Sequence, residues 1–332
     1  MKSSGRNPLV VGFTREHLKQ AEALARAAYQ EERAAVPALP PELPALELDE
    51  FAENGMGVAA LDPEDGRLLG FLCGCSPFER AFRATQARGV FSPMHANAAQ
   101  REGRADIYAR MLPAAQERWA RAGASSHAVC LYAHDRETQR LFFTYGFGLR
   151  CIDAIRSTAG GPEEPPPPGI RWKELTAEEM ELAYPLILRL DDHMAASPTF
   201  IRRVSLSLEA FRKECREDDS RCFAALEGSR AAAVLLAGRG GGETVVSDRP
   251  EMWNIRGAYC LPEYRGSGLY GKLLENAVRT LHREGAGRLG VDFESINPAA
   301  NRFWPKYFTP YTHSVTRRID EDVLKELASP DK

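Results

Sequence analysis

The sequence lacks the features that would assign it to a membrane or to nucleic acid. Met1-Lys2-Ser3-Ser4-Gly5 leads into no apolar signal segment, and no apolar run approaches the length that spans a bilayer. The formal net charge is −3, whereas general nucleic-acid binders usually carry a basic surface. We therefore expect neither a membrane nor nucleic acid as a partner.

Cysteines and metal-binding patterns are also scarce. The seven cysteines are scattered, and Cys73 and Cys75 stand too close together for zinc-finger spacing. No group of His, Cys and Glu in the sequence has the spacing of metal ligands. We expect small, reduced cysteines in the core of a cytoplasmic protein, and no metal site.

What is present is the composition of a globular protein in two parts. Hydrophobic residues make up 44% and charged residues 27% of 332 positions, enough for two domains with a core each. Residues 159–169 contain four consecutive prolines, which cannot continue a helix or a central strand. We therefore predict domains at residues 1–158 and 170–332, joined by a stiff linker.

The two halves repeat each other. Helical patterns open at Phe13 and at Leu175, which lie 162 positions apart (175 minus 13). The same offset relates two further pairs of segments, residues 70–73 with 232–235 and residues 135–142 with 297–304. A constant offset at three separated places indicates two copies of one fold.

Periodicity in the second half alternates between strand and helix. Strands are predicted at 170–173, 222–226, 231–237, 253–261, 288–293 and 311–319, and helices at 177–190, 207–216, 269–281 and 299–307. Residues 227–230 form the turn of a hairpin. This order predicts a mixed α/β domain rather than an all-parallel sheet.

The most informative segment is a glycine-rich turn between a strand and a helix. Residues 258–261 run into Arg265-Gly266-Ser267-Gly268, which opens an amphipathic helix. Glycine lets the backbone approach a ligand closely, and the first N–H groups of a helix have no partner within it. Such a turn favours an anion, typically a pyrophosphate.

One interpretation of this turn is a dinucleotide site. Gly266, Gly268 and Gly271 satisfy Gly-x-Gly-x-x-Gly, and Asp292 follows at about the spacing of a ribose-binding acid. This would indicate a nicotinamide-dependent dehydrogenase. However, residues 262–265 intrude where that fold turns tightly, and too little chain follows the motif to complete a doubly wound sheet.

A second interpretation accounts for more residues. The strand and turn, followed by Asn297-x-x-Ala300-x-x-Phe303-Trp304, resemble the GCN5-related N-acetyltransferases (GNAT). That family's turn reads Gln/Arg-x-x-Gly-x-Gly/Ala and holds the pyrophosphate of acetyl-CoA. Residues 100–105 match it at every defined position. The resemblance implies two tandem GNAT-like domains, each a mostly antiparallel mixed sheet flanked by helices. It also implies acetyl transfer to the amine of a small molecule or protein, by a monomer or homodimer.

The resemblance also implies which residues bind acetyl-CoA. The strand would pair its backbone with the pantetheine arm, the turn would hold the pyrophosphate, and the later Asn and Trp would flank the arm. The residues in these three groups are Ala258, Tyr259, Cys260, Leu261, Arg265, Gly266, Ser267, Gly268, Leu269, Tyr270, Asn297 and Trp304. Tyr270 stands where the family has Gly or Ala, and Asn297 could instead cap the helix that Pro298 begins.

The catalytic groups are less clearly indicated. Many family members place a tyrosine acid where this chain has Trp304 and, in the first half, Phe142, so the acid role is open. Tyr307 could supply it if the helix presents its hydroxyl to the sulfur, or it could be a core residue. Asp292 and Glu294 share one face at a strand end, and either could be the base or a salt-bridged acid.

The halves differ in their expected helix after the turn. Pro113 should bend or shorten the first one, so we expect acetyl-CoA in the second half, with the first half either a degenerate copy or a second binding site. Residues 190–198, with paired acids and His193, would face the acceptor. Loss of the tyrosine acid in both halves leaves a non-catalytic acyl-CoA-binding or sensing protein as the alternative.

Overall fold

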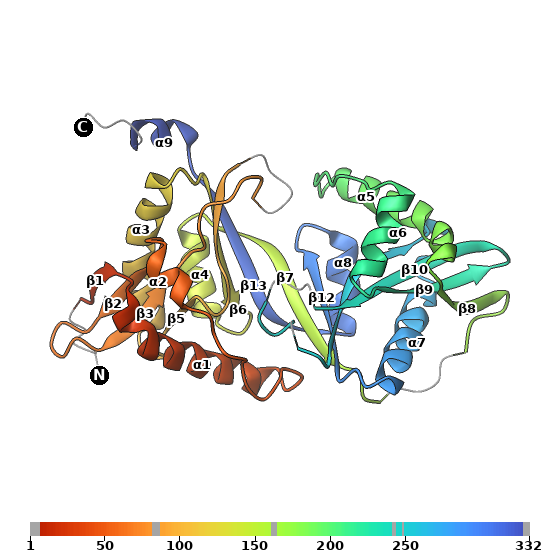
Figure 1. The fold of residues 1–332 in the computed structure, drawn as a ribbon, viewed down its shortest axis with the longest axis horizontal. Coiled ribbons are helices and arrows are strands. Elements are labelled where there is room, and N and C mark those ends of the chain that lie inside the picture. The colour runs from red at the N-terminus through yellow and green to blue at the C-terminus, as the bar shows by residue number, and fades with distance from the viewer. Residues whose placement is uncertain (1–6, 82–86, 161–164, 241–243, 248, 328–332) are drawn as a thin grey trace. The chain divides into compact units, whose positions relative to one another are not determined.

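A computed structural model describes residues 7–81, 87–160, 165–240, 244–247 and 249–327. The chain divides into two compact units (Figure 1). Unit 1 comprises Met1–Ile152 and Pro310–Lys332, and unit 2 comprises Asp153–Thr309. The boundary therefore lies at Ile152, earlier than the predicted 158, and the last 23 positions belong to the first unit rather than the second.

Unit 1 contains two groups of strands with helices against them. One sheet has the order β1-β2-β3-β5, and the other strands follow the order β4-β6-β13. The strands are β1 (Leu9–Gly12), β2 (Val58–Leu61), β3 (Leu68–Leu72), β4 (Gly89–Ser92), β5 (Asn97–Ala99), β6 (Ser126–Tyr132) and β13 (Thr309–Arg318). The helices are η1 (Arg15–His17), α1 (Leu18–Ala35), α2 (Asp49–Glu53), α3 (Arg104–Arg121), α4 (Arg136–Thr144) and α9 (Glu321–Leu327).

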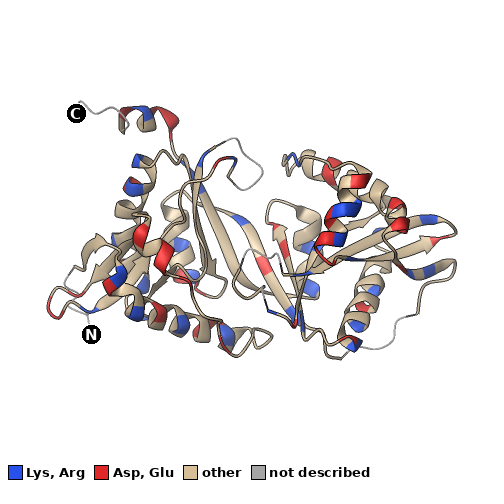
Figure 2. Cartoon of the chain, viewed as in Figure 1, with Lys and Arg blue, Asp and Glu red and all other residues tan. Residues whose placement is uncertain are grey.

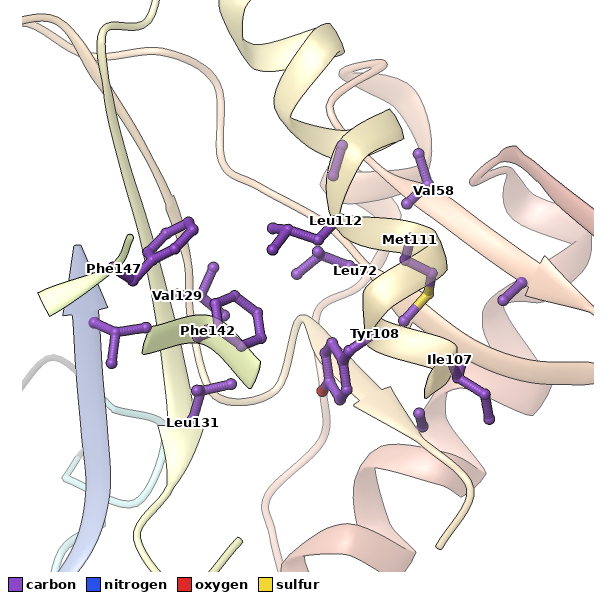
Figure 3. Packing of buried hydrophobic residues seen from close by; sticks show 14 of the residues in the cluster. Val58, Leu72, Ile107, Tyr108, Met111, Leu112, Val129, Leu131, Phe142 and Phe147 are labelled. Carbon is purple, nitrogen blue, oxygen red and sulfur yellow. The ribbon is translucent and has the colours of Figure 1, made fainter. Parts of the chain in front are cut away.

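Alternating side chains of β2 and β3 divide the core of unit 1 into two layers. Val58 and Leu72 pack with α3, where Met111 and Leu112 are fully buried (Figure 3). Alanines 21, 25 and 28 of α1 pack with Phe71 on the opposite face. Because strand side chains alternate between faces, the same short strands support a helix on each side.

Unit 2 has one mixed sheet. The second part of β7 (Gly148–Ser157) begins the order β7-β12-β11-β10-β9-β8. The other strands are β8 (Ile170–Leu175), β9 (Arg221–Glu227), β10 (Arg230–Arg239), β11 (Met252–Cys260) and β12 (Arg288–Glu294). The helices are η2 (Glu178–Leu182), α5 (Tyr184–Ala195), α6 (Leu208–Glu217), η3 (Pro262–Tyr264), α7 (Leu269–Arg283), α8 (Pro298–Phe303) and η4 (Trp304–Lys306).

The pairings from β8 to β11 are antiparallel, and the pairing of β11 with β12 is parallel. One face of the sheet packs with α5 and α6, through Leu186, Phe211 and Tyr259 among others. This mixed architecture confirms the predicted fold class. It differs from the doubly wound parallel sheet that the dehydrogenase interpretation requires.

Each unit is completed by the last strand of the other half of the sequence. In unit 1, residues 312–318 of β13 pair antiparallel with residues 132–126 of β6. In unit 2, Thr158 follows β7 and bonds with its backbone N–H to Gly287 O at 3.2 Å. A cut at 158/159 would therefore separate Thr158 from Gly287 in unit 2 and β13 from β6 in unit 1.

Several predicted elements have different ends from those expected. The helix predicted at 177–190 is a 3-10 turn followed by α5, which starts next to Pro185. The helix predicted at 299–307 ends early because Pro305 falls in its last turn, which becomes 3-10. Contrary to expectation, α3 is not short: it continues from Pro113 to Arg121, where Ala115 and Trp119 anchor it in the core.

The surface charges agree with the small net charge of the sequence. Figure 2 shows Lys and Arg intermixed with Asp and Glu along the helices of both units. Within the described part of the chain, no helix combines the length and apolar character needed to cross a membrane.

Candidate functional site

The site in unit 2 begins where two parallel strands separate. β11 and β12 pair from Met252 with Arg288 to Ile255 with Val291, and among the described residues this pairing goes no further. β11 nevertheless continues along β10 as far as Cys260. One edge of β11 is therefore left facing a gap rather than a neighbouring strand.

The direction of the β11 amides follows from one hydrogen bond just beyond the strand. The N–H of Leu261 donates to Ala232 O at 3.0 Å, toward β10. Amides along a strand point alternately to the two sides, so those of Ala258 and Cys260 point toward the gap. The Cys260 carbonyl accepts a hydrogen bond from Arg265 Nε at 2.9 Å.

The glycine turn lies at the end of this gap. Gly266 and Gly268 have φ angles of 79° and 83°, in the left-handed region that favours glycine, and a β-carbon on either would meet nothing within 4 Å. Gly268 is the N-cap of α7. Ser267 Oγ accepts the Leu269 N–H at 3.3 Å, which leaves the next amides of the first turn for a ligand.

Arg265 is held in place beside this turn. Besides its bond to Cys260, its guanidinium lies 5.2 Å from the centre of the Tyr259 ring. Both contacts orient the side chain at the mouth of the gap, close to the N-terminus of α7.

A cavity of about 490 Å³ follows the gap from the separated strands to the turn. It brings together nine of the predicted binding residues, namely Ala258, Tyr259, Cys260, Arg265, Gly266, Gly268, Tyr270, Asn297 and Trp304. Leu261 and Leu269 are instead buried in the core, and Ser267 bonds within the turn. These three predicted residues therefore support the site and do not line it.

An aromatic cluster forms one wall of the cavity. Tyr270 lies in the first turn of α7, where Tyr costs little in dihedral terms, and its ring contacts those of Phe303 and Trp304 edge-on at 5.1 and 6.3 Å. Its hydroxyl donates to Val234 O at 3.3 Å, and burial raises its pKa far above the usual value. Tyr270 thus fills space that Gly or Ala would leave open.

Tyr307 lines the same cavity but lies toward the glycine turn. A β-carbon on Gly271 would overlap its hydroxyl. Burial raises the pKa of Tyr307, Glu275 raises it further, and Arg156 opposes this. The structure thus places this hydroxyl over the first turn of α7.

A second, smaller cavity of about 100 Å³ adjoins the first, and Asp292 and Glu294 line it. The two carboxylates lie on one face of β12, with buried Phe293 on the other, as their spacing predicted. Ala258, Asn297 and Trp304 line both cavities, so the carboxylates lie at the strand end of the site and the turn at its other end.

Asn297 is the N-cap of α8, which its sequence context allowed, and it also lines the cavities. Its Oδ1 accepts the N–H groups of Ala299 and Ala300 at 3.1 and 3.4 Å. The same Oδ1 lies 3.5 Å from His193 Nε2.

The sequence did not lead us to the basic residues that line the two cavities. Arg302 and Lys306 line the large cavity, and Arg203 and Arg256 line the small one. The spacing of Arg302 and Lys306, four apart on a predicted helix after Asn297, was the available signal for the first pair. Arg203 had none, because it follows α5 in an irregular segment.

Unit 1 fills the corresponding place with its own side chains. The strand equivalent to β11 is broken into β4 and β5, and Asn97, the first residue of β5, reaches across to β6. Its Nδ2 donates to Cys130 O at 3.1 Å and to Pro93 O at 3.0 Å, and its Oδ1 accepts from the Tyr108 hydroxyl at 2.8 Å. At the first turn of α3, Arg104 is bound by Glu31.

No metal site was found in the part of the chain that the structure describes, where no three His, Cys, Asp or Glu residues gather to hold an ion.

Burial raises the pKa of Cys260, which faces the large cavity, to about 11, so its thiol stays protonated at neutral pH.

Comparison with known proteins points to one family. Residues 187–308 match the family model described as the acetyltransferase (GNAT) family. The fold resembles a GCN5-related N-acetyltransferase from Sphaerobacter thermophilus, with a TM-score of 0.58 and 11% identity over 93% of this chain and 95% of that one. At this identity the likeness shows a shared fold.

Weaker likenesses include a tandem GNAT protein from the clavulanic acid biosynthesis pathway and a GCN5-related N-acetyltransferase from Kribbella flavida. Their TM-scores are 0.46 and 0.44. The first is 11% identical over 98% of this chain and 99% of that one, and the second 13% identical over 87% and 94%. No match was found among curated proteins.

Proposed function

We propose that unit 2, whose residues 187–308 match the acetyltransferase (GNAT) family model, transfers an acetyl group from acetyl-CoA to an amine. One observation carries the proposal: the gap between β11 and β12 leads, through one cavity, to the glycine turn and the N-terminus of α7. An extended thioester with a pyrophosphate at one end matches this arrangement, with the pyrophosphate at the glycine turn and the thioester at the gap between the strands.

The turn would hold the pyrophosphate. The first amides of α7 and the positive end of its dipole favour an anion, and Gly266 and Gly268 let it approach the backbone. Arg265, Arg302 and Lys306 add positive charge along the cavity. The amides of Ala258 and Cys260 would pair with the amides of the pantetheine arm.

The chemistry would take place where the two cavities meet. An amine nitrogen attacks the thioester carbon, and a β11 N–H such as that of Ala258 would stabilise the charge on its oxygen. A lysine-like ammonium has a pKa near 10.4 and must first lose a proton, for which Glu294 and Asp292 are the nearest carboxylates at that end.

The leaving thiolate would not depend on a tyrosine acid. Trp304 occupies the usual position and cannot donate a useful proton, and Tyr307 lies toward the turn. A thiol of pKa about 8.5 leaves as a moderately stable anion and can be protonated by water. We therefore assign Tyr307 to cofactor binding rather than to acid catalysis.

A non-catalytic acyl-CoA-binding protein is the second candidate, favoured by the buried Trp304 in the tyrosine position. One experiment separates the two. The full chain is incubated with acetyl-CoA and a panel of amines while free thiol is monitored. Amine-dependent thiol release supports transfer, and tight binding without release from any amine would favour the sensor.

A further inference from the structure

The small cavity beside the proposed reaction centre has a distinct charge pattern. It shares Leu190, Ala258, Asn297, Ala300 and Trp304 with the large cavity, so it opens on the place where the acetyl group would lie. At about 100 Å³ against about 490 Å³, it would admit the head group of an acceptor and not a large body. The side chains around it therefore bear on what the acceptor is.

Two acidic residues line the small cavity. Asp292 and Glu294 come from the last residues of β12, and one carboxylate oxygen of Glu294 is shielded from solvent. Apolar Val291 and Phe293 also line this cavity. An ammonium group fits beside two carboxylates, and loss of its proton there would yield the reacting amine.

Two arginines also line the small cavity, and they are not equivalent. The guanidinium of Arg256 is engaged by Asp218 and donates to Arg239 O at 2.9 Å, over Gly238 on β10. Arg203 differs: across the described residues, none forms a hydrogen bond or ion pair with its side chain, and it is exposed. Its charge is therefore available to a ligand in this cavity.

From this pattern we propose that the acceptor is an amino acid, whose ammonium group faces Asp292 and Glu294 and whose carboxylate binds Arg203. The inference rests on the proposed acetyl transfer. After Glu294 or solvent has taken the ammonium proton, the nitrogen forms a C–N bond to the acetyl carbon and the C–S bond breaks. The products are an N-acetylamino acid and CoA thiol.

The other acceptors of the family fit this pattern less well. A polyamine would bring a second cation toward Arg203, where like charges repel. A lysine within a protein is flanked by neutral amides, which leave Arg203 without an anion. A carboxylate can accept two parallel N–H bonds from the planar guanidinium, which a carboxamide cannot match.

The test compares three acceptors that differ only at the carboxylate: an amino acid, its carboxamide and the corresponding decarboxylated amine. Wild-type protein should have the highest kcat/KM for the amino acid. Arg203→Gln should raise KM for the amino acid about tenfold to a hundredfold, with kcat nearly unchanged and the carboxamide unaffected. Arg203→Lys should restore part of the affinity, and Arg202→Gln is the matched neighbour control.

Equal kcat/KM for amino acid and carboxamide, or an equal effect of Arg203→Gln on both, would overturn the inference but leave acetyl transfer intact. If no amine releases thiol, the proposed transfer fails separately. Calorimetry in the presence of CoA then decides the inference. Binding of the amino acid that Arg203→Gln weakens supports it, and the absence of such binding overturns it.

Discussion

The hydroxyl of Tyr307 lies directly over the α-carbon of Gly271 in the first turn of α7. This relationship joins the last turn of the α8–η4 segment to the helix end that we propose for the pyrophosphate. A methyl group at position 271 would have to displace the ring of Tyr307.

Gly271→Ala should therefore weaken acetyl-CoA binding, by about tenfold if Tyr307 is pushed into the cavity. Calorimetric titration of acetyl-CoA measures this. Tyr307→Phe with Gly271→Ala is the control, because removing the hydroxyl relieves the clash and should recover affinity. Unchanged affinity in Gly271→Ala would show that Tyr307 moves without touching the ligand.

Gly268→Asp should abolish most acetyl-CoA binding. The substitution places a side chain at a φ of 83°, and adds a negative charge where the pyrophosphate would lie. Gly103→Asp is a matched control, because Gly103 is the N-cap of α3 in unit 1 and has a φ of 66°. We expect Gly103→Asp to leave binding intact. The reverse ranking in calorimetry would move the site to unit 1.

Separating the sequence halves should destabilise both. A fragment of residues 170–332 loses the Arg156–Glu275 ion pair, whose two N···O distances are 2.6 and 3.2 Å, and the bonds of Thr158. A fragment of residues 1–158 loses β13, the antiparallel partner of β6. Each fragment should unfold at a much lower temperature than the full chain in circular dichroism. Two fragments as stable as the intact protein would contradict the observation that each unit is completed by a strand from the other half of the sequence.

Unit 1 should lose stability in mild acid. Burial lowers the pKa of both His95 and His127 to about 4, so their neutral forms are favoured in the folded state. The stabilising contribution of each neutral histidine is therefore fully present above pH 6.5, the pKa of histidine in the unfolded chain, and it is lost as the pH drops toward 4. For a fully buried histidine, the free energy of unfolding should fall by on the order of 3 kcal/mol over this range.

His127→Gln should flatten this dependence, because Gln has no proton to gain. Denaturant unfolding of wild type and His127→Gln at pH 7 and pH 4.5 gives, for each protein, the slope of the free energy of unfolding against pH. Equal slopes would mean that His127 takes up its proton without unfolding the unit.

The sequence was a good guide where local chemistry dictates structure. The left-handed angles of Gly266 and Gly268 follow from the need for glycine in a tight turn before a helix. Alternation along a strand correctly placed Asp292 and Glu294 on one face. Such features depend on residues that are neighbours in the chain.

Features that depend on distant segments could not be predicted. The pairing of β13 with β6 joins residues that are far apart in the sequence, and the residue pattern of neither strand predicts which strand it pairs with. Arg203 reaches the small cavity from an irregular segment. The expectation that Pro113 shortens α3 was wrong because burial of Trp119 and Ala115 offsets the cost of a proline inside a helix. That cost can be estimated from the local sequence, but the burial cannot.

The most direct test of the central claim is the rate of acetyl-CoA-dependent acetylation, measured by mass spectrometry on one accepted amine for wild type, Gly268→Asp and Gly103→Asp. Transfer in unit 2 predicts that wild type and Gly103→Asp form product at similar rates, while Gly268→Asp loses at least about 100-fold in kcat/KM. Equal rates for wild type and Gly268→Asp would contradict the claim.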